Sequence, residues 1–127
     1  MDFNSIIKFI NEFELDNRNL CKVQFLVAEH LGELVGFGRI RNHENCFELC
    51  SLGVVEPKRL QGIGKRLVEE LILKSDQPLY LVCIIPEYFV PFGFKIVKEY
   101  PIDLEEKLNY CTSELVVKET YVVMKHF

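Results

Sequence analysis

Residues 57–70, with the sequence PKRLQGIGKRLVEE, combine two glycines and four basic residues at the point where a helical pattern begins. Apolar residues at helical spacing predict a helix over residues 64–74, with a stripe made of Ile63, Leu67, Val68, Leu71 and Ile72. Because the N-terminus of a helix is already the positive end of its dipole, basic residues there are unfavourable. A bound anion would reverse that field, so the segment predicts a phosphate-binding turn at the start of the helix.

Two common phosphate-binding motifs do not fit this turn. The Walker pattern needs Ser or Thr after Gly-Lys to hold magnesium, and Arg66 stands there. The dinucleotide pattern needs a third glycine where the chain has Leu67, and the pair Gly36 and Gly38 lies within a predicted strand with no third glycine. These residues argue against the usual kinase and oxidoreductase interpretations.

The segments around the turn predict a single α/β domain over residues 1–127, built on a mixed sheet of about six to seven strands with helices on both faces. The nearly all-apolar run 78–85 suits a central strand covered on both faces. The other predicted elements are a helix at 3–13, strands at 22–30, 34–42, 45–55, 95–100 and 114–127, a short helix or turn at 86–94, and a helical turn at 101–111.

Composition narrows the class of protein. A net charge of −4 and a pI near 5.4 argue against a general binder of nucleic acid or membrane surfaces. The N-terminus lacks the basic region of a signal peptide, and no apolar run reaches the ~18 residues of a transmembrane helix. Five cysteines without a CxxC pair, and three histidines not spaced from a cysteine pair as metal ligands, predict a cytoplasmic protein with no metal.

Two motifs carry a resemblance to a known family. Residues 59–64 match R/Q-x-x-G-x-G/A, the pyrophosphate loop of the GNAT superfamily of acyl-CoA-dependent N-acetyltransferases, and residues 88–94, YFVPFGF, resemble its second signature. The similarity runs from about residue 22 to the end of the chain. ELCSLGV at 48–54 is similar to the amino-acid N-acetyltransferase branch, which includes acetylglutamate-synthase-like domains. That branch also has counterparts of Pro101, Lys107 and Cys111.

The resemblance implies an acetyl-CoA site. The loop amides would grip the CoA pyrophosphate, the backbone of the preceding strand would pair with the pantetheine arm, and the Val54 N–H would polarise the thioester carbonyl. The residues that the resemblance assigns to CoA are Leu52, Gly53, Val54, Arg59, Leu60, Gln61, Gly62, Ile63, Gly64, Lys65 and Phe89.

Proton transfer needs further groups. The acceptor amine must lose a proton before it attacks, and Glu48, which matches the Glu of ELxSL, is the candidate base. The alternative is that Glu48 faces solvent or pairs with Arg39 or Arg41. In the family, a tyrosine four residues before the signature glycine often protonates the leaving thiolate, and here that position is Phe89. Tyr88 is adjacent but would face elsewhere in a helical turn, so Tyr88, water or unassisted departure stay open.

The acceptor site is less defined. Arg39 and Arg41 lie two apart on one strand face and could bind a substrate carboxylate, or could simply be solvated at a sheet edge. The chain departs from the family pattern at Glu56, where the family often has proline, and the usual first strand is absent.

The prediction is an N-acetyltransferase that moves the acetyl group of acetyl-CoA to the primary amine of a small, amino-acid-like molecule by direct attack. Phe89 and the short N-terminus keep open the alternative of a non-catalytic acyl-CoA-binding regulatory module, and a nucleotide-binding domain of another type is a third option. No nucleic acid or membrane partner is expected, and a homodimer is allowed.

Overall fold

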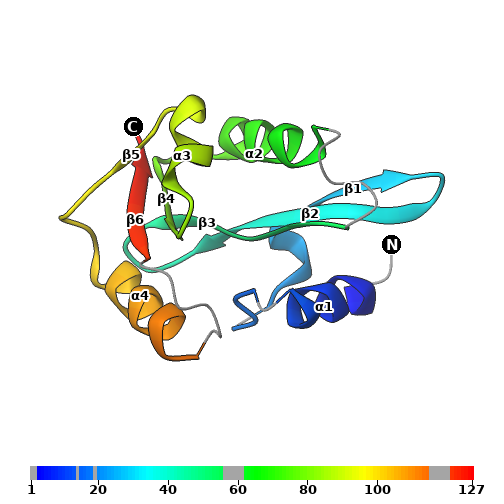
Figure 1. Cartoon of the computed structure of the whole chain (residues 1–127), viewed down its shortest axis with the longest axis horizontal. Helices are drawn as coiled ribbons and strands as arrows, with labels where there is room; N and C mark the ends of the chain where they lie inside the picture. The colour runs from blue at the N-terminus through cyan, green and yellow to red at the C-terminus, as the bar shows by residue number, and fades with distance from the viewer. Residues whose placement is uncertain (1–2, 14, 19, 56–61, 115–120) are drawn as a thin grey trace.

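One mixed β-sheet organises the computed structural model, which describes residues 3–13, 15–18, 20–55, 62–114 and 121–127 (Figure 1). In that part of the chain six strands lie in the order β1-β2-β3-β4-β6-β5. Helices α2 and α3 cover one face of the sheet, and α1 and α4 cover the other (Figure 1). The predicted α/β class, with helices on both faces, is confirmed.

The elements follow the predicted order. The helices are α1 Phe3–Glu12, α2 Ile63–Lys74, α3 Pro86–Phe89 and α4 Ile102–Glu114, and the strands are β1 Phe25–His30, β2 Glu33–Asn42, β3 Phe47–Val54, β4 Leu79–Cys83, β5 Phe94–Ile96 and β6 Val122–His126. Short 3-10 turns at Lys22–Gln24 and Val90–Phe92 complete the set.

Most boundaries lie within two residues of the prediction, and four differ by more. The last strand is predicted from residue 114, but Glu114 ends α4 and β6 begins at Val122. Residues 22–24 form a 3-10 turn rather than the start of a strand, and β5 ends at Ile96 rather than residue 100. The helical turn expected at 101–111 is a complete helix, α4. Its buried side chains Leu104, Lys107 and Cys111 follow helical spacing, but the lysine among them hides the apolar periodicity in the sequence.

Two apolar clusters hold the helices to the sheet. On one face, Val68 and Leu71 of α2 pack with residues of β3, β4 and β6. On the other face, Ile6 and Ile10 of α1 pack against the fully buried Phe37 of β2. Phe9 and Phe13 extend this second cluster, because both rings stack on Phe37 with centroids 6.5 and 6.4 Å away.

Strands β3 and β4 separate soon after they begin to pair. Their parallel ladder joins Phe47 to Leu79 and Glu48 to Tyr80, and the described residues add no further pair. Beyond this point β4 continues to pair with β6 as far as Cys83 and Val122. The sheet therefore opens into a wedge between the C-terminal halves of β3 and β4, and the mouth of the wedge faces the start of α2.

A β-bulge bends β3 within the same region. Arg39 of β2 is opposite Cys50, and Phe37 is opposite Gly53, so two residues of β3, Ser51 and Leu52, stand opposite Gly38. Such an insertion kinks a strand and increases its twist. The bulge thus turns the last residues of β3 away from the line of β4.

We expect Gly53→Ala to destabilise the fold by about 1–3 kcal/mol, the range for overpacking a filled core. An added Cβ at Gly53 would lie 2.7 Å from Cζ of the buried Phe37 ring and 3.1 Å from Phe13. At Gly38 an added Cβ would instead lie 3.0 Å from the Cδ1 atoms of Leu52 and Leu71, which can rotate. Urea unfolding should therefore rank Gly38→Ala as the milder change, and equal losses would contradict the packing described.

Candidate functional site

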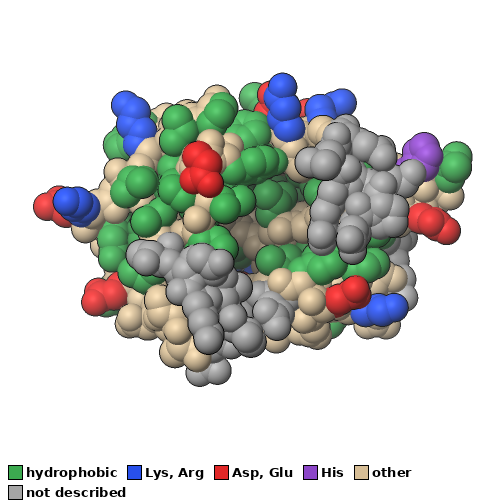
Figure 2. Space-filling model, in the orientation of Figure 1, with side chains coloured by type: hydrophobic (Ala, Val, Ile, Leu, Met, Phe, Trp, Pro, Cys, Tyr) green, Lys and Arg blue, Asp and Glu red, His purple; other side chains and the backbone are tan. Residues whose placement is uncertain are grey.

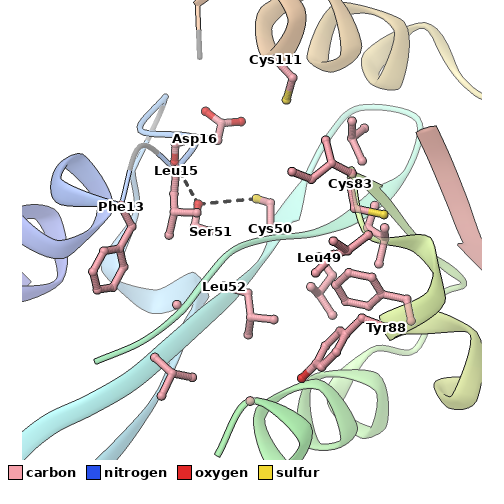
Figure 3. A pocket seen from close by; sticks show the side chains of 18 of the residues that line it. Phe13, Leu15, Asp16, Leu49, Cys50, Ser51, Leu52, Cys83, Tyr88 and Cys111 are labelled. Atoms are coloured by element: carbon pink, nitrogen blue, oxygen red, sulfur yellow. Dashed lines mark hydrogen bonds between the residues drawn. The ribbon is translucent and has the colours of Figure 1, made fainter. Parts of the chain in front are cut away.

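A cavity of about 670 Å³ occupies the wedge between β3 and β4. Residues 49–54 of β3 line one side, and residues 81–85, from β4 and the connection to α3, line the other. Tyr88 and Phe89 of α3, Phe13 and Leu15 near α1, and Lys107 and Cys111 of α4 complete much of the wall (Figure 3). The surface in Figure 2 is hollowed near its centre, with hydrophobic side chains around the hollow.

The start of α2 forms the mouth of the cavity. Gly62 precedes the helix with φ of 79°, a left-handed conformation that suits glycine, and its carbonyl accepts the first helical hydrogen bond, from Arg66. Gly64 and Lys65 line the cavity, so the positive end of a helix of 12 residues faces it. Backbone N–H groups at such an end form an anion site.

The structure places some predicted loop residues and not others. Ile63 packs inward, because its Cγ2 lies 2.9 Å from where a Cβ on Gly36 of β2 would stand. Arg59, Leu60 and Gln61 lie outside the described residues, as does Glu56.

Leu52, Gly53 and Val54 line the cavity along the side of β3 that faces away from β2. The Val55 N–H donates to the Val35 carbonyl of β2 at 2.8 Å. Because N–H groups alternate in direction along an antiparallel ladder, the Val54 N–H points to the opposite edge, toward the wedge. The strand edge that the resemblance assigns to pantetheine thus borders the cavity.

Tyr88 and Phe89 both line the cavity, so the expectation that Tyr88 faces elsewhere in a helical turn is wrong. The Tyr88 hydroxyl lies 2.9 Å from the position that a Cβ on Gly64 would take, which places it at the start of α2. Phe89 is buried and meets the Tyr88 ring edge to face, with centroids 5.0 Å apart. Burial raises the pKa of Tyr88, so the phenol keeps its proton at neutral pH.

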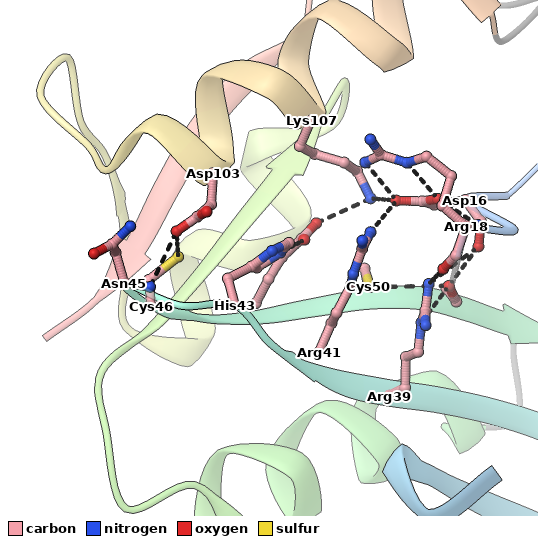
Figure 4. A network of polar contacts seen from close by, with 12 residues as sticks. Asp16, Arg18, Arg39, Arg41, His43, Asn45, Cys46, Cys50, Asp103 and Lys107 are labelled. Carbon is pink, nitrogen blue, oxygen red and sulfur yellow. Dashed lines mark hydrogen bonds and ion pairs between the residues drawn. The ribbon is translucent and has the colours of Figure 1, made fainter. Parts of the chain in front are cut away.

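Glu48 is fully buried and takes neither of the alternative positions considered for it. It does not face solvent, and its carboxylate contacts His43 and Lys107 instead of Arg39 or Arg41. His43 Nε2 lies 2.7 Å from Oε1, and Lys107 Nζ lies 2.9 Å from Oε2 (Figure 4). The lysine contact is an ion pair without hydrogen-bond geometry. Glu48 is not in the cavity wall, so it affects the cavity indirectly, by pairing with Lys107, which is in the wall.

Asp16 is the centre of the polar network in Figure 4. Lys107 Nζ donates to its Oδ2 at 2.7 Å, and Arg18 reaches both carboxylate oxygens at 3.1 Å. Arg41 NH1 lies 3.5 Å from the same Oδ2. Asp16 and Lys107 both line the cavity, so its polar end is an ion pair supported by arginines.

Burial and ion pairing act in opposite directions on these groups. Burial alone would raise the pKa of Asp16 and of Glu48, but the Arg18 hydrogen bond and Lys107 lower that of Asp16, and Lys107 with His43 lowers that of Glu48. Burial would lower the pKa of Lys107, but Cys50, Glu48 and Asp16 beside it raise the pKa above its usual value. Both carboxylates and the ammonium are therefore charged at neutral pH.

Arg39 and Arg41 share one face of β2, and both reach the loop that contains Asp16 and Arg18. Arg39 is fully buried, and donates to the Ser51 hydroxyl and the Arg18 carbonyl at 3.0 Å each. Neither arginine is in the cavity wall, and neither is the solvated edge residue considered as an alternative. Their predicted contact with substrate stays a prediction, which this placement does not favour.

Sequence reasoning missed Asp16 and underused Lys107. Asp16 stands in a polar loop with no motif around it, and its partner is 91 positions away. Lys107 was assigned only through the resemblance, although it lies on the buried stripe of α4 and in the cavity wall. Cys50, Cys83 and Cys111 are buried, Cys21 is exposed, and burial raises the pKa of Cys83 and of Cys111 to about 11.

The described residues contain neither a candidate metal site nor a candidate membrane-spanning helix. Over that part of the chain no cluster of three or more His, Cys, Asp or Glu side chains could hold a metal ion. Among the same residues, no helix has the length and apolar character needed to cross a membrane.

Residues 4–84 match the sequence profile of the Acetyltransferase (GNAT) family, which spans more than half of the chain. The chain therefore belongs to the GNAT family of acetyltransferases. No curated protein sequence is significantly similar to it.

Solved structures with the same fold include acyl-CoA enzymes. N-acetylglutamate synthase from Neisseria gonorrhoeae, complexed with coenzyme A and N-acetyl-glutamate, superposes with a TM-score of 0.73 at 18% identity over 96% of this chain, which corresponds to 31% of the synthase. Rv2747 from Mycobacterium tuberculosis, in complex with CoA, superposes with a TM-score of 0.73 at 18% identity. The match covers 96% of this chain and 91% of Rv2747. Arabidopsis thaliana Naa50, in complex with a bisubstrate analogue, superposes with a TM-score of 0.61 at 19% identity. The match covers 98% of this chain and 93% of Naa50.

We expect acid to unfold the protein partly through Asp16. Because its pKa is lowered on folding, its stabilising effect is present above the ordinary value of 3.8 and is lost as pH falls below it. Thermal unfolding between about pH 5 and pH 2 should show a Tm that falls on acidification, and Asp16→Asn should flatten that slope. An unchanged slope in Asp16→Asn would contradict the ion pairs assigned to this carboxylate.

Glu48 and Lys107 should be energetically coupled. We expect Glu48→Gln or Lys107→Met alone to destabilise the protein by about 3–5 kcal/mol, because each leaves a buried charge poorly compensated. The double variant should cost less than the sum of the two changes, which urea unfolding of the full cycle measures. Glu69→Gln with Lys74→Met, on exposed positions of α2, is the control and should be additive. Additivity at 48 and 107 would count against the buried pair.

Proposed function

We propose that this chain transfers the acetyl group of acetyl-CoA to the primary amine of a small, amino-acid-like acceptor, by direct attack of the amine on the thioester. The observation that supports this most directly is the wedge between β3 and β4, which opens onto the glycine-rich start of α2. An extended arm that ends in a diphosphate matches a strand edge followed by a helix N-terminus.

The residues at the mouth fit a diphosphate. Gly62 has open space around the position of a Cβ, and Gly64 and Lys65 face the cavity at the positive end of α2. Lys65 adds a full positive charge, which is otherwise unfavourable there. Arg59, Leu60 and Gln61 are proposed to complete this loop, in line with the family motif.

The side of β3 fits the arm between the diphosphate and the reacting thioester. Leu52, Gly53 and Val54 border the wedge, and β4 pairs with β3 only at Leu79 and Tyr80, while its other edge stays paired with β6. Acyl-CoA supplies an activated carbonyl, and the chain contributes its N–H groups and an apolar wall, of which Phe89 is part.

The acceptor is proposed to enter at the opposite end, where Phe13 and Leu15 meet the Asp16–Lys107 ion pair. In the described part of the wall, Lys107 is the cation nearest to that end. Its ammonium is already paired with Asp16 and Glu48, but Arg18 and Arg41 also surround Asp16. We therefore propose that this group of cations, with Lys107 as its member in the cavity wall, attracts an acceptor carboxylate, without direct contact to Arg39 or Arg41.

Neither of the two carboxylates described at the polar end of the cavity is an exposed base. Glu48 is buried behind Lys107, and both Glu48 and Asp16 have lowered pKa values, so neither takes up a proton readily. We propose that Glu48 acts by balancing the charge of Lys107, while the ammonium proton of the acceptor leaves through water. Tyr88, protonated and in the cavity wall, is the proposed donor to the departing thiolate.

A thiol-release assay with acetyl-CoA over amino acids, polyamines and peptide N-termini tests the proposal, with calorimetry measuring CoA binding alone. We expect Lys65→Ala to weaken CoA binding about tenfold, because a hydrogen bond to a charged group contributes roughly 1.5–3 kcal/mol. Lys74→Ala, at the far end of α2, is the matched control and should bind as the unmodified chain does.

The outcomes separate the candidate functions. Binding of CoA with thiol release on an amine supports the acetyltransferase. Binding without turnover on any amine would favour the non-catalytic acyl-CoA-binding module. Absence of CoA binding would contradict both.

A further inference from the structure

Ser51 holds a backbone conformation that residues other than glycine rarely adopt. Its φ is 54°, in the middle of β3 and at the start of the bulge. The other described non-glycine residue with positive φ, Leu31, lies in the tight turn between β1 and β2. A left-handed residue inside a strand persists only where its surroundings impose the conformation.

Two buried hydrogen bonds impose it here. The Ser51 hydroxyl donates to the Asp16 backbone carbonyl at 2.9 Å and accepts from Arg39 Nε at 3.0 Å. Arg39 NH2 also donates to the Arg18 carbonyl at 3.0 Å. The loop made of residues 16–18 is therefore held against β3 by hydrogen bonds of the Ser51 hydroxyl and the Arg39 guanidinium (Figures 3 and 4).

These hydrogen bonds join the polar end of the cavity to its β3 side. The loop contributes the Asp16 carboxylate, which meets Lys107 at the polar end. On the strand side, the residue after Ser51 begins the Leu52 to Val54 edge along the wedge. Arg39 itself is fully buried and outside the cavity wall, so it acts through other residues.

We propose that Arg39 and Ser51 are positioning residues that form a strut, which holds the acceptor end of the cavity in register with the strand edge that takes acyl-CoA. The names of the two substrates rest on the proposed function, whereas the mechanical coupling of loop and strand does not. Removing the hydrogen bonds of Ser51 or Arg39 should make the 16–18 loop more mobile and misplace the acceptor. The diphosphate site at the start of α2 should stay intact.

Hydrogen–deuterium exchange tests the coupling without any substrate. Ser51→Gly removes the hydroxyl but accepts the left-handed backbone, and Ser51→Ala removes the hydroxyl and keeps the unfavourable conformation. We expect exchange over residues 15–18 to rise about fivefold or more in both, the factor for losing about one net hydrogen bond, while Leu52 to Val54 exchange as before. Strand β6 should exchange as before, and Ser51→Ala should have the lower Tm. Ser113→Ala, an exposed hydroxyl on α4, is the control.

Kinetics test the positioning role. In Ser51→Gly and Arg39→Lys we expect the KM for the acceptor to rise about tenfold, equivalent to about 1.4 kcal/mol, while CoA affinity changes less than about twofold. Unchanged exchange in the loop, or an equal loss of CoA affinity, would overturn the strut. If the unmodified chain binds no CoA, the proposed function fails, and the exchange experiment alone decides whether loop and strand are coupled.

Discussion

Strands β3 and β4 pair through only two pairs of residues in the described structure, and the cavity begins where that pairing stops. Backbone groups of a buried strand normally need partners, so a sheet opens in this way only if something else holds both halves. The antiparallel partner β6 holds β4, and the antiparallel partner β2 holds β3, whose bulge lies opposite Gly38. The opening leaves a strand edge along which an extended ligand can lie, directly before the positive end of α2.

The polar end of the cavity has a different physical basis. Asp16 and Glu48 are buried carboxylates, and burial of an unpaired charge is costly. Lys107 forms an ion pair with both carboxylates. Arg18 and Arg41 also pair with Asp16, and His43 contacts Glu48. Buried ion pairs contribute little net stability, but they fix geometry because each partner depends on the others. This network links α4, the 16–18 loop and β3 around the polar end of the cavity.

Much of the fold was readable from the sequence because its signals are local. The glycines and basic residues at the start of α2 are contiguous, and the run around Leu79–Cys83 is apolar enough to identify an interior strand. The polar end was not readable, since Asp16 and Lys107 meet only through the tertiary fold. Ser51 gave no signal either, because its left-handed backbone depends on Arg39 and a distant carbonyl. The prediction for Tyr88 failed because a helix of four residues is too short for its hydrophobic periodicity to show which side faces the cavity.

The central claim is that the opening between β3 and β4 is the acyl-CoA site. Titration of the isotopically labelled protein with CoA, followed by amide chemical shifts in NMR spectra, tests it most directly. The account predicts the largest shifts at Leu52, Gly53 and Val54 and at Gly62, Gly64 and Lys65, with little change along β1. Shifts concentrated on another surface, or none at CoA concentrations that saturate binding, would contradict it.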